Sequence, residues 1–252
     1  MPDDVLPASF RETSPKQLPL YRGLLRITGD TLEGPLETDA FDVIPGPEGE
    51  VGLVLLDLQT RDAEPSEVAQ ALLSKATRGL AERTPLHAIM LDLVRGLFEF
   101  SGSELRATLL RFSVTDSRFE ISTAGMPPAA CAHATGTIAV HAAASPPLTS
   151  ITRVPPPVQV LPLVWGSTWM VVSDGFTSGS DHPDVVHRLA QDLDLCAKGL
   201  ALSGESPDAL YDTLASRVSE SGRFARDDAT LVLIGADPNA RFQSGIRAGV
   251  KE

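Results

Sequence analysis

The chain has 252 residues, enough for one large domain or two small ones with a substantial buried core. Hydrophobic residues make up 42% of it and charged residues 21%, which are ordinary proportions for a soluble globular protein. The formal net charge is −12, from 33 acidic and 21 basic residues. This balance argues against nucleic acid or an anionic membrane as the main partner.

The sequence predicts neither a targeting signal nor a cysteine motif. The N-terminal residues contain no basic stretch followed by an apolar segment, so no signal peptide is predicted. No apolar run approaches the roughly 18 residues that a membrane span needs. Cys131 and Cys196 lie far apart without a C-x-x-C partner, and both are predicted to be buried free thiols. We therefore expect a cytoplasmic protein.

The first third of the chain predicts an extended lead-in followed by strands. Residues 1–20 carry four prolines and no hydrophobic period, so they read as extended or disordered. Strands are expected at 22–28 and 41–44. A third strand is expected at 51–56, where a continuous apolar run ends at Asp57. Such a run is typical of a strand buried on both faces.

Two helices are expected next. Pro65 marks the start of the first, whose apolar residues recur every four positions: Val68, Leu72, Ala76 and Leu80. In the second, Thr84 is the expected N-cap and Pro85 the first helical residue. Its apolar face consists of Leu86, Ile89, Leu93 and Leu97.

The remaining chain returns to strands, then helices, then a strand. Strands are expected at 105–114, 118–122, 158–164, 168–173 and 229–234, with a hairpin turn at 115–117 and short strands and loops within 126–160. Helices are expected to begin near 183 and 206, and residues 237–252 are expected to form a loose tail. Strands and helices do not alternate. Helices grouped outside antiparallel sheets, an α+β fold, therefore fit better than a parallel doubly wound sheet.

Four aspartates lie at the ends of these apolar strands. Asp57 and Asp174 follow strands, Asp227 lies just before the last strand, and Asp39 opens the strand at 41–44. One such residue alone is commonly a helix cap or a turn residue. A lone carboxylate at the rim of a core carries a desolvation penalty, and a hard divalent cation would remove it. Mg²⁺ and Mn²⁺ prefer oxygen ligands, so the four together indicate a metal site.

Five short segments of the sequence, taken in chain order, carry a resemblance to a known family. They are Glu-Thr-Asp-Ala-Phe-Asp-Val at 37–43, Asp-Leu-Gln-Thr-Arg-Asp at 57–62, Thr-Ala-Gly-Met-Pro-Pro at 123–128, Val-Ser-Asp-Gly-Phe at 172–176 and Asp-Asp-Ala-Thr-Leu-Val-Leu at 227–233. With them the chain resembles the metal-dependent (type 2C) protein phosphatases, in the bacterial branch typified by the sporulation phosphatase SpoIIE and its stress-response relatives. The resemblance covers residues 21 to 235. It implies an αββα sandwich of two antiparallel sheets flanked by helices, over residues 21–236, with flexible ends at 1–20 and 237–252.

The resemblance also implies a site that holds two Mn²⁺ or Mg²⁺ ions. Asp57 would bridge the ions, and Asp174 and Asp227 would complete the ligands of one of them. The backbone carbonyl of Leu58, with Asp39, would serve the other. Asp57, Asp174 and Asp227 would thus carry catalysis, because paired cations activate a water for in-line attack on phosphorus.

The expected substrate is a phosphoserine or phosphothreonine of a regulatory phosphoprotein, such as an anti-sigma-factor antagonist. The resemblance supplies this expectation, and no nucleic-acid or membrane partner is expected. Arg61 is a candidate contact for the substrate phosphate, although a solvated loop arginine is the alternative.

Two segments depart from the family pattern and leave alternatives open. The family's Gly-Gly before Asp39 is replaced by Glu37 and Thr38, and its Ser-Gly-His-Gly by residues 59–62. Met126 stands where the family has histidine, which predicts a structural role. A pseudophosphatase that serves as a regulatory binding module is therefore the main alternative. A haloacid-dehalogenase-like phosphatase is a weaker one, because Asp57 and the three residues after it only partly match D-x-D-x-T.

Overall fold

The computed structural model describes residues 25–32, 39–46, 50–60, 65–100, 102–113, 115–132, 138–141, 145–177 and 229–236. The predicted lead-in, the C-terminal tail and the helices expected near 183 and 206 lie outside these residues. So do Arg61, Asp227 and Cys196.

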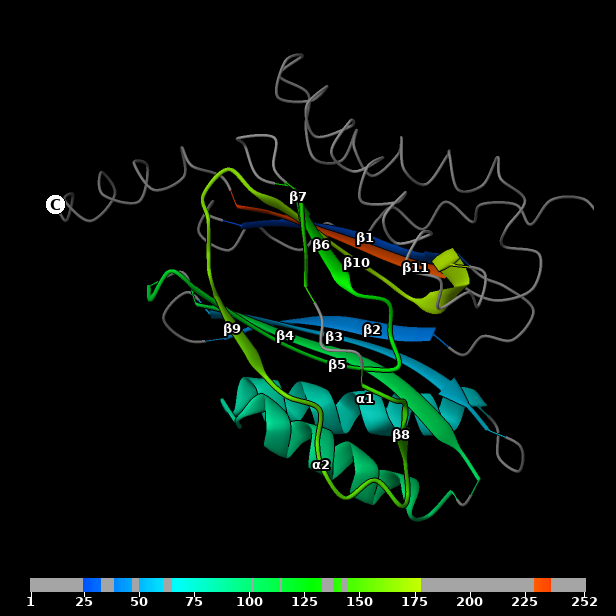
Figure 1. Ribbon diagram of the computed structural model, residues 1–252. Helices are drawn as coiled ribbons and strands as arrows, with labels where there is room; N and C mark the ends of the chain where they lie inside the picture. Colours follow the sequence, from blue (N-terminus) through cyan, green and yellow to red (C-terminus); the bar gives the residue numbers. More distant parts are fainter. Residues whose placement is uncertain are drawn as a thin grey trace, which may run out of the picture.

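Two antiparallel sheets face each other in the described part of the chain (Figure 1). The helix-covered sheet has the order β2 (Asp39–Pro45), β3 (Glu50–Gln59), β4 (Glu104–Ser113), β5 (Arg118–Ala124) and β9 (Gln159–Pro162), and β8 (Leu148–Thr149) also pairs with β4. The second sheet has the order β1 (Leu25–Leu32), β11 (Ala229–Ala236), β10 (Thr168–Val172), β6 (Ala129–Ala132) and β7 (Ile138–His141). The predicted α+β sandwich is confirmed. The dehalogenase-like alternative, which needs strands that alternate with helices, is excluded.

Helices α1 (Pro65–Ala81) and α2 (Leu86–Leu97) lie against the outer face of the helix-covered sheet (Figure 1). Both helices were predicted, but the N-cap of α2 was not. Pro85, not Thr84, occupies the cap position, and no side chain caps the helix. The carbonyl of Pro85 accepts hydrogen bonds from the N–H groups of Ala88 and Ile89, so the backbone itself closes the first turn.

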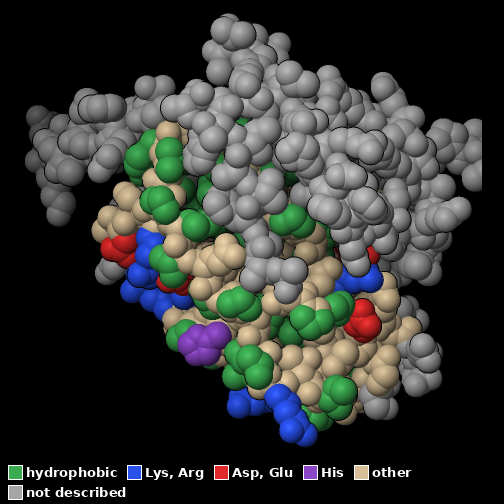
Figure 2. Space-filling model, viewed as in Figure 1, with side chains coloured by type: hydrophobic (Ala, Val, Ile, Leu, Met, Phe, Trp, Pro, Cys, Tyr) green, Lys and Arg blue, Asp and Glu red, His purple; other side chains and the backbone are tan. Residues whose placement is uncertain are grey.

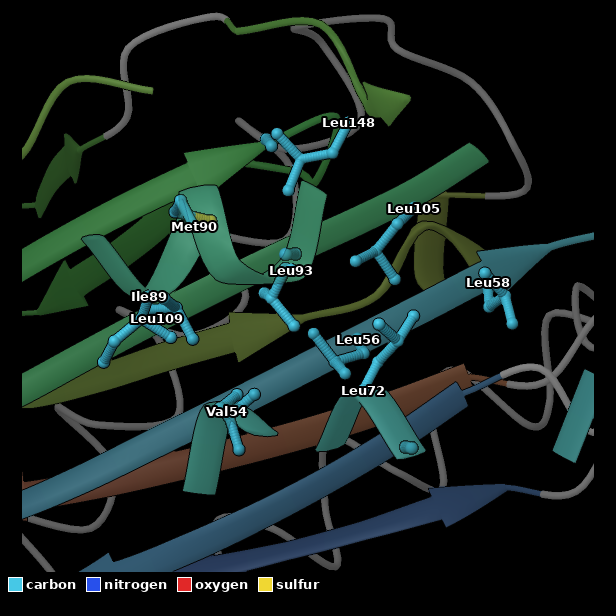
Figure 3. Close-up of a cluster of buried hydrophobic side chains, with 14 of the residues drawn as sticks. Val54, Leu56, Leu58, Leu72, Ile89, Met90, Leu93, Leu105, Leu109 and Leu148 are labelled. Carbon is cyan, nitrogen blue, oxygen red and sulfur yellow. The ribbon is translucent and has the colours of Figure 1, made fainter. Parts of the chain in front are cut away.

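Side chains of β3 alternate between two hydrophobic cores, as the period of a strand requires. Leu56 and Leu58 point toward the helices, where Leu56 meets Leu72 of α1 (Figure 3). Leu53 and Leu55 point the other way, into the core between the sheets. The continuous apolar run in the sequence is therefore explained by burial on both faces.

Aromatic side chains bridge the two sheets. Trp169 of β10 packs on Phe119 of β5 with ring centroids 4.2 Å apart, and Phe119 packs on Phe112 of β4 at 4.7 Å. All three rings are almost fully buried. This contact fixes the separation of the sheets near the middle of the core, and the polar residues described below lie between the same two sheets.

Several strands extend beyond their predicted limits. β3 continues through Asp57 to Gln59, so Asp57 lies within the strand and not after it. β1 begins at Leu25 and runs to Leu32, four residues beyond the predicted end at residue 28. Pairing explains both, because all of β3 is matched by β4 and all of β1 by β11. Neighbouring strands therefore override local sequence signals.

The visible surface is mixed in character. Figure 2 shows hydrophobic side chains scattered among polar atoms, with basic side chains at the left, at the right and at the lower edge of the coloured part of the molecule. Large exposed hydrophobic residues are Phe98, Ile151, Val154, Val160 and Val164. Among the described helices, none is long and apolar enough to cross a membrane.

Candidate active site

A row of charged side chains crosses three neighbouring strands of the helix-covered sheet. Asp39 of β2 lies directly opposite Asp57 of β3, and Asp57 lies directly opposite Arg106 of β4. The alternation of each strand turns these residues toward the second sheet, on the same face as Leu55 and Leu110. Antiparallel pairing thus brings together residues that are distant in sequence.

Asp174 reaches this row from the second sheet. It follows β10 and opens the short 3₁₀ turn η2 (Asp174–Thr177). Arg106 Nη1 donates to Asp57 Oδ2 across 2.9 Å and also to Asp174 Oδ2. The side chains of Asp57 and Asp174 are only 2% and 8% exposed, and that of Arg106 is 19% exposed. A buried cluster of two carboxylates and one guanidinium therefore joins the sheets.

The electrostatics of the cluster follow from burial and crowding. Burial, together with the neighbouring Asp174 carboxylate, raises the pKa of Asp57 to about 7, and Arg106 opposes this rise only in part. Burial acts to lower the pKa of Arg106, but the carboxylates of Asp174 and Asp57 outweigh it and raise that pKa above its ordinary value. One guanidinium therefore does not fully compensate the two carboxylates.

Asp39 has its own link to the second sheet. Its Oδ2 accepts a hydrogen bond from Thr230 Oγ1 of β11 at 2.8 Å. Thr230 is held in turn by Ser173, whose hydroxyl accepts from the Thr230 N–H at 2.9 Å and whose N–H donates to the Thr230 carbonyl. Because Ser173 directly precedes Asp174, one hydrogen-bonded unit positions Asp39 and the start of η2 together.

Gly125 supports the cluster from β5's end. Its φ is +64°, in the left-handed region that favours glycine. A Cβ at this position would lie 2.6 Å from Pro147 Cγ and 2.9 Å from Arg106 Cγ. The glycine of the Thr-Ala-Gly-Met-Pro-Pro segment therefore leaves room for the Arg106 stem. Met126 beside it packs in the core between the sheets, which agrees with its predicted structural role.

The described part of the altered loop has ordinary backbone geometry. Gln59 still belongs to β3 and pairs with Glu104, and Thr60 Oγ1 accepts a hydrogen bond from Ser103 Oγ at 3.0 Å. Neither Gln59 nor Thr60 has a positive φ. Leu58 anchors its side chain in the core beneath the helices. The replacement of the family's Ser-Gly-His-Gly thus introduces no left-handed strain up to residue 60.

The predicted ligands are brought together in part. Asp57 and Asp174 converge, and Asp39 lies beside Asp57 in the row, while Asp227 and Arg61 lie outside the described residues. Among the described residues, no group of three or more His, Cys, Asp or Glu side chains is arranged to hold a metal ion. The two buried carboxylates are nevertheless of the ligand type that Mg²⁺ and Mn²⁺ prefer. They fit a divalent cation in chemistry, and Arg106 supplies positive charge at the same place.

Sequence reasoning missed Arg106, Ser173 and Thr230. Ser173 and Thr230 are ordinary residues at strand ends and gave no signal of their own. A usable signal existed for Arg106, since it is a charged residue in the largely apolar segment Leu-Arg-Ala-Thr-Leu-Leu at 105–110. Its alternation with Leu110 and Phe112 predicts that it faces inward. An inward arginine needs a buried acidic partner, and that requirement pointed toward the aspartates.

Comparison with known protein families finds one match. The model for stage II sporulation protein E (SpoIIE) matches residues 47–237, which is most of the chain. A search of curated proteins finds no match.

Several solved structures have a similar fold. The RsbU and RsbW domains of Rv1364c from Mycobacterium tuberculosis superpose with a TM-score of 0.70 at 20% identity, over 85% of this chain and 60% of that one. RsbX in complex with magnesium gives 0.64 at 14% identity, over 84% and 94%. The catalytic domain of serine/threonine protein phosphatase PstP, in complex with two manganese ions, gives 0.61 at 14% identity, over 85% and 99%. At these identities the likeness establishes the fold, and the chain spans less than two thirds of the Rv1364c structure.

Proposed function

This chain belongs to the SpoIIE family of metal-dependent protein serine/threonine phosphatases, and we propose that it hydrolyses phosphoserine or phosphothreonine on a regulatory phosphoprotein. The observation that carries the proposal is the convergence of Asp57 and Asp174, which come from different sheets and meet in a buried cluster. Structural packing alone gives little reason to bury two carboxylates beside each other, because their mutual repulsion is costly.

In this proposal Asp57, Asp174 and Asp227 are the carboxylates that hold divalent cations, either Mn²⁺ or Mg²⁺, as two ions. Asp39 and the carbonyl of Leu58 would contribute on the side of β2 and β3. When bound, such cations supply an activated water and neutralise charge on the phosphoryl oxygens. The support from comparison is that RsbX and PstP were solved with magnesium and with two manganese ions.

The chain's own residues would set the geometry of this site. The row on β2 and β3 fixes Asp39 and Asp57 relative to each other through strand register. Ser173 and Thr230 hold the start of η2, and with it the position of Asp174. Arg61, immediately after the described Thr60, is the proposed contact for the substrate phosphate.

The substrate class we propose is a small bacterial regulatory phosphoprotein, such as an anti-sigma-factor antagonist. The similarity to the RsbU and RsbW domains of Rv1364c supports this assignment. The cytoplasmic location predicted from the sequence suits such a substrate, and the acidic net charge of −12 does not suit nucleic acid.

The test is metal-dependent turnover of p-nitrophenyl phosphate and of a phosphoserine peptide by the full chain. We expect activity with Mn²⁺ or Mg²⁺, loss of activity in EDTA, resistance to thiol alkylation and no trapped phospho-enzyme, since no protein nucleophile takes part. A phosphorylated aspartate recovered from the reaction would contradict the proposal.

A second candidate, a pseudophosphatase that serves as a regulatory binding module, is favoured by one observation. Arg106 already donates to both carboxylates, as a structural counter-ion would. A folded protein that turns over neither substrate at any concentration of either metal would contradict the phosphatase proposal and favour this second candidate.

A further inference from the structure

Arg106 is hydrogen-bonded to two of the carboxylates proposed above as metal ligands. Its Nη1 donates to Asp57 Oδ2 at 2.9 Å and to Asp174 Oδ2. All three side chains are largely buried. A single nitrogen of Arg106 thus links two acidic side chains that would hold a divalent cation in the proposed site.

We propose that Arg106 is a built-in cation that competes with divalent metal for Asp57 and Asp174. This inference deepens the proposed function and rests on it. A guanidinium and a divalent cation on the same carboxylates would repel each other, so metal binding would favour withdrawal of the guanidinium from the two oxygens. Arg106 would therefore weaken metal binding and raise the metal concentration at which the site fills.

Strand pairing and local packing fix the position of the Arg106 side chain. Strand register sets it opposite Asp57, and Gly125 leaves the space that its stem needs, since a Cβ there would lie 2.9 Å from Arg106 Cγ. Another acidic side chain lies near enough to attract a displaced guanidinium. Glu104 lies two residues earlier on the same strand, and its charge already acts on Arg106.

Charge counting gives the direction of the effect. When both carboxylates are ionised, as metal binding requires, the cluster of Asp57, Asp174 and Arg106 carries one net negative charge, and without the arginine it carries two. A divalent cation binds more tightly to the more negative set of ligands. Removing the arginine charge should therefore tighten metal binding even though it weakens the metal-free fold.

The experiment measures Mn²⁺ binding to the metal-depleted full chain by electron paramagnetic resonance. We expect Arg106→Gln to bind Mn²⁺ at least tenfold more tightly than the parent chain. The matched control is Arg111→Gln, which removes another buried arginine from β4. Arg111 donates to the Thr84 carbonyl on the opposite face and does not touch Asp57 or Asp174. Its affinity should stay at the parent value.

A second measurement covers the case in which Arg106→Gln does not fold. In the parent chain, the Arg106 side-chain Nε–H signal in ¹⁵N NMR, assigned by its loss in Arg106→Lys, should shift and exchange faster with water as Mg²⁺ is added. An unchanged signal at saturating Mg²⁺, or an Arg106→Gln affinity equal to or below that of the parent, overturns the competition.

These measurements distinguish the proposed competition by Arg106 from the proposed phosphatase activity. If Arg106→Gln tightens Mn²⁺ binding but neither protein hydrolyses a phosphoester, the competition holds and the phosphatase assignment fails. If both hydrolyse with equal metal affinity, the phosphatase assignment holds and the competition fails. If neither the parent chain nor Arg106→Gln binds Mn²⁺, both the competition and the phosphatase assignment fail.

Discussion

Asp39 on β2 and Thr230 on β11 are 191 positions apart, and a hydrogen bond of 2.8 Å joins them across the two sheets. β2 is the edge strand of the helix-covered sheet, so this bond ties an edge to the interior of the second sheet. Thr230 is fully buried, and the bond involves a carboxylate, which makes it stronger than a bond between neutral groups.

Thr230→Val should therefore destabilise the fold. Valine keeps the shape of threonine but removes the hydroxyl that donates to Asp39, and a lost bond to a charged group costs about 1–3 kcal/mol. Urea denaturation followed by circular dichroism measures the change. Thr230→Ser keeps the hydroxyl and serves as control, with a smaller loss from the missing methyl group. Equal losses in the two variants would show that the hydrogen bond contributes nothing.

Asp174→Asn should abolish metal-dependent hydrolysis while the protein stays folded. The amide keeps the size of the side chain but lacks the charge that a divalent cation needs. The melting temperature in EDTA should change little, because relief of repulsion with Asp57 offsets the lost ion pair with Arg106. The control is Asp92→Asn, an exposed aspartate on α2 that pairs only with Arg95 in the described structure. Turnover at the wild-type rate by Asp174→Asn would show that Asp174 is not a metal ligand.

Gly125→Ala should cost more stability than Gly102→Ala. Both glycines have positive φ, and a non-glycine residue there costs about 1–2 kcal/mol. At Gly125 the added methyl group also collides with Pro147 and Arg106, and such overpacking costs about 1–3 kcal/mol more. At Gly102 nothing lies within 4 Å of the new Cβ. The difference between the two variants in urea isolates the crowding, and no difference would mean that Pro147 and Arg106 move aside freely.

The Cys131 thiol should be inert in the folded protein. Burial raises its pKa to about 12, against a weaker opposing effect of a hydrogen bond with Ser167. In a Cys196→Ala background, Ellman's reagent at pH 8 should label Cys131 only after urea is added. Rapid labelling of the native protein would contradict its burial between the sheets.

The same shift predicts a dependence of stability on pH. The unfolded thiol ionises near pH 9, whereas the folded thiol stays protonated until about pH 12. The unfolded state therefore binds fewer protons in that window, and the free energy of unfolding falls as pH rises through it. A Cys131→Ala variant should show a shallower decline, measured by urea denaturation at a series of pH values between 8 and 11.

Much of the fold was predictable because its signals are local. The four-residue repeat of α1 and the apolar run of β3 each reflect burial that a single element experiences. Element limits were less accurate, since Asp57 to Gln59 stay in β3 through pairing with neighbouring strands, above all with Leu105 and its neighbours on β4. The predicted N-cap of α2, Thr84, was wrong because backbone hydrogen bonds decide where this helix begins. Pro85 satisfies the first turn through its carbonyl, and no side-chain signal is needed.

The site was predictable only as far as acidic residues mark it. Asp57 and Asp174 stand out at the ends of apolar runs, and their convergence agrees with the prediction. Arg106 was missed because its significance depends on register, which places it opposite Asp57. A sequence does not state which residue of one strand faces which residue of the next. The roles of Asp227 and Arg61 stay predictions.

The row of charged side chains on β2, β3 and β4 also affects how β3 and β4 align during folding. Because side chains alternate, a slip of one residue between β3 and β4 would turn either Asp57 or Arg106 toward the helices, among leucines such as Leu56 and Leu58. An unpaired charge in that apolar layer would be far more costly than the paired arrangement between the sheets. The ion pair therefore penalises misaligned strands during folding. A chain that has reached the correct alignment of β3 and β4 has, by the same step, placed Arg106 beside Asp57.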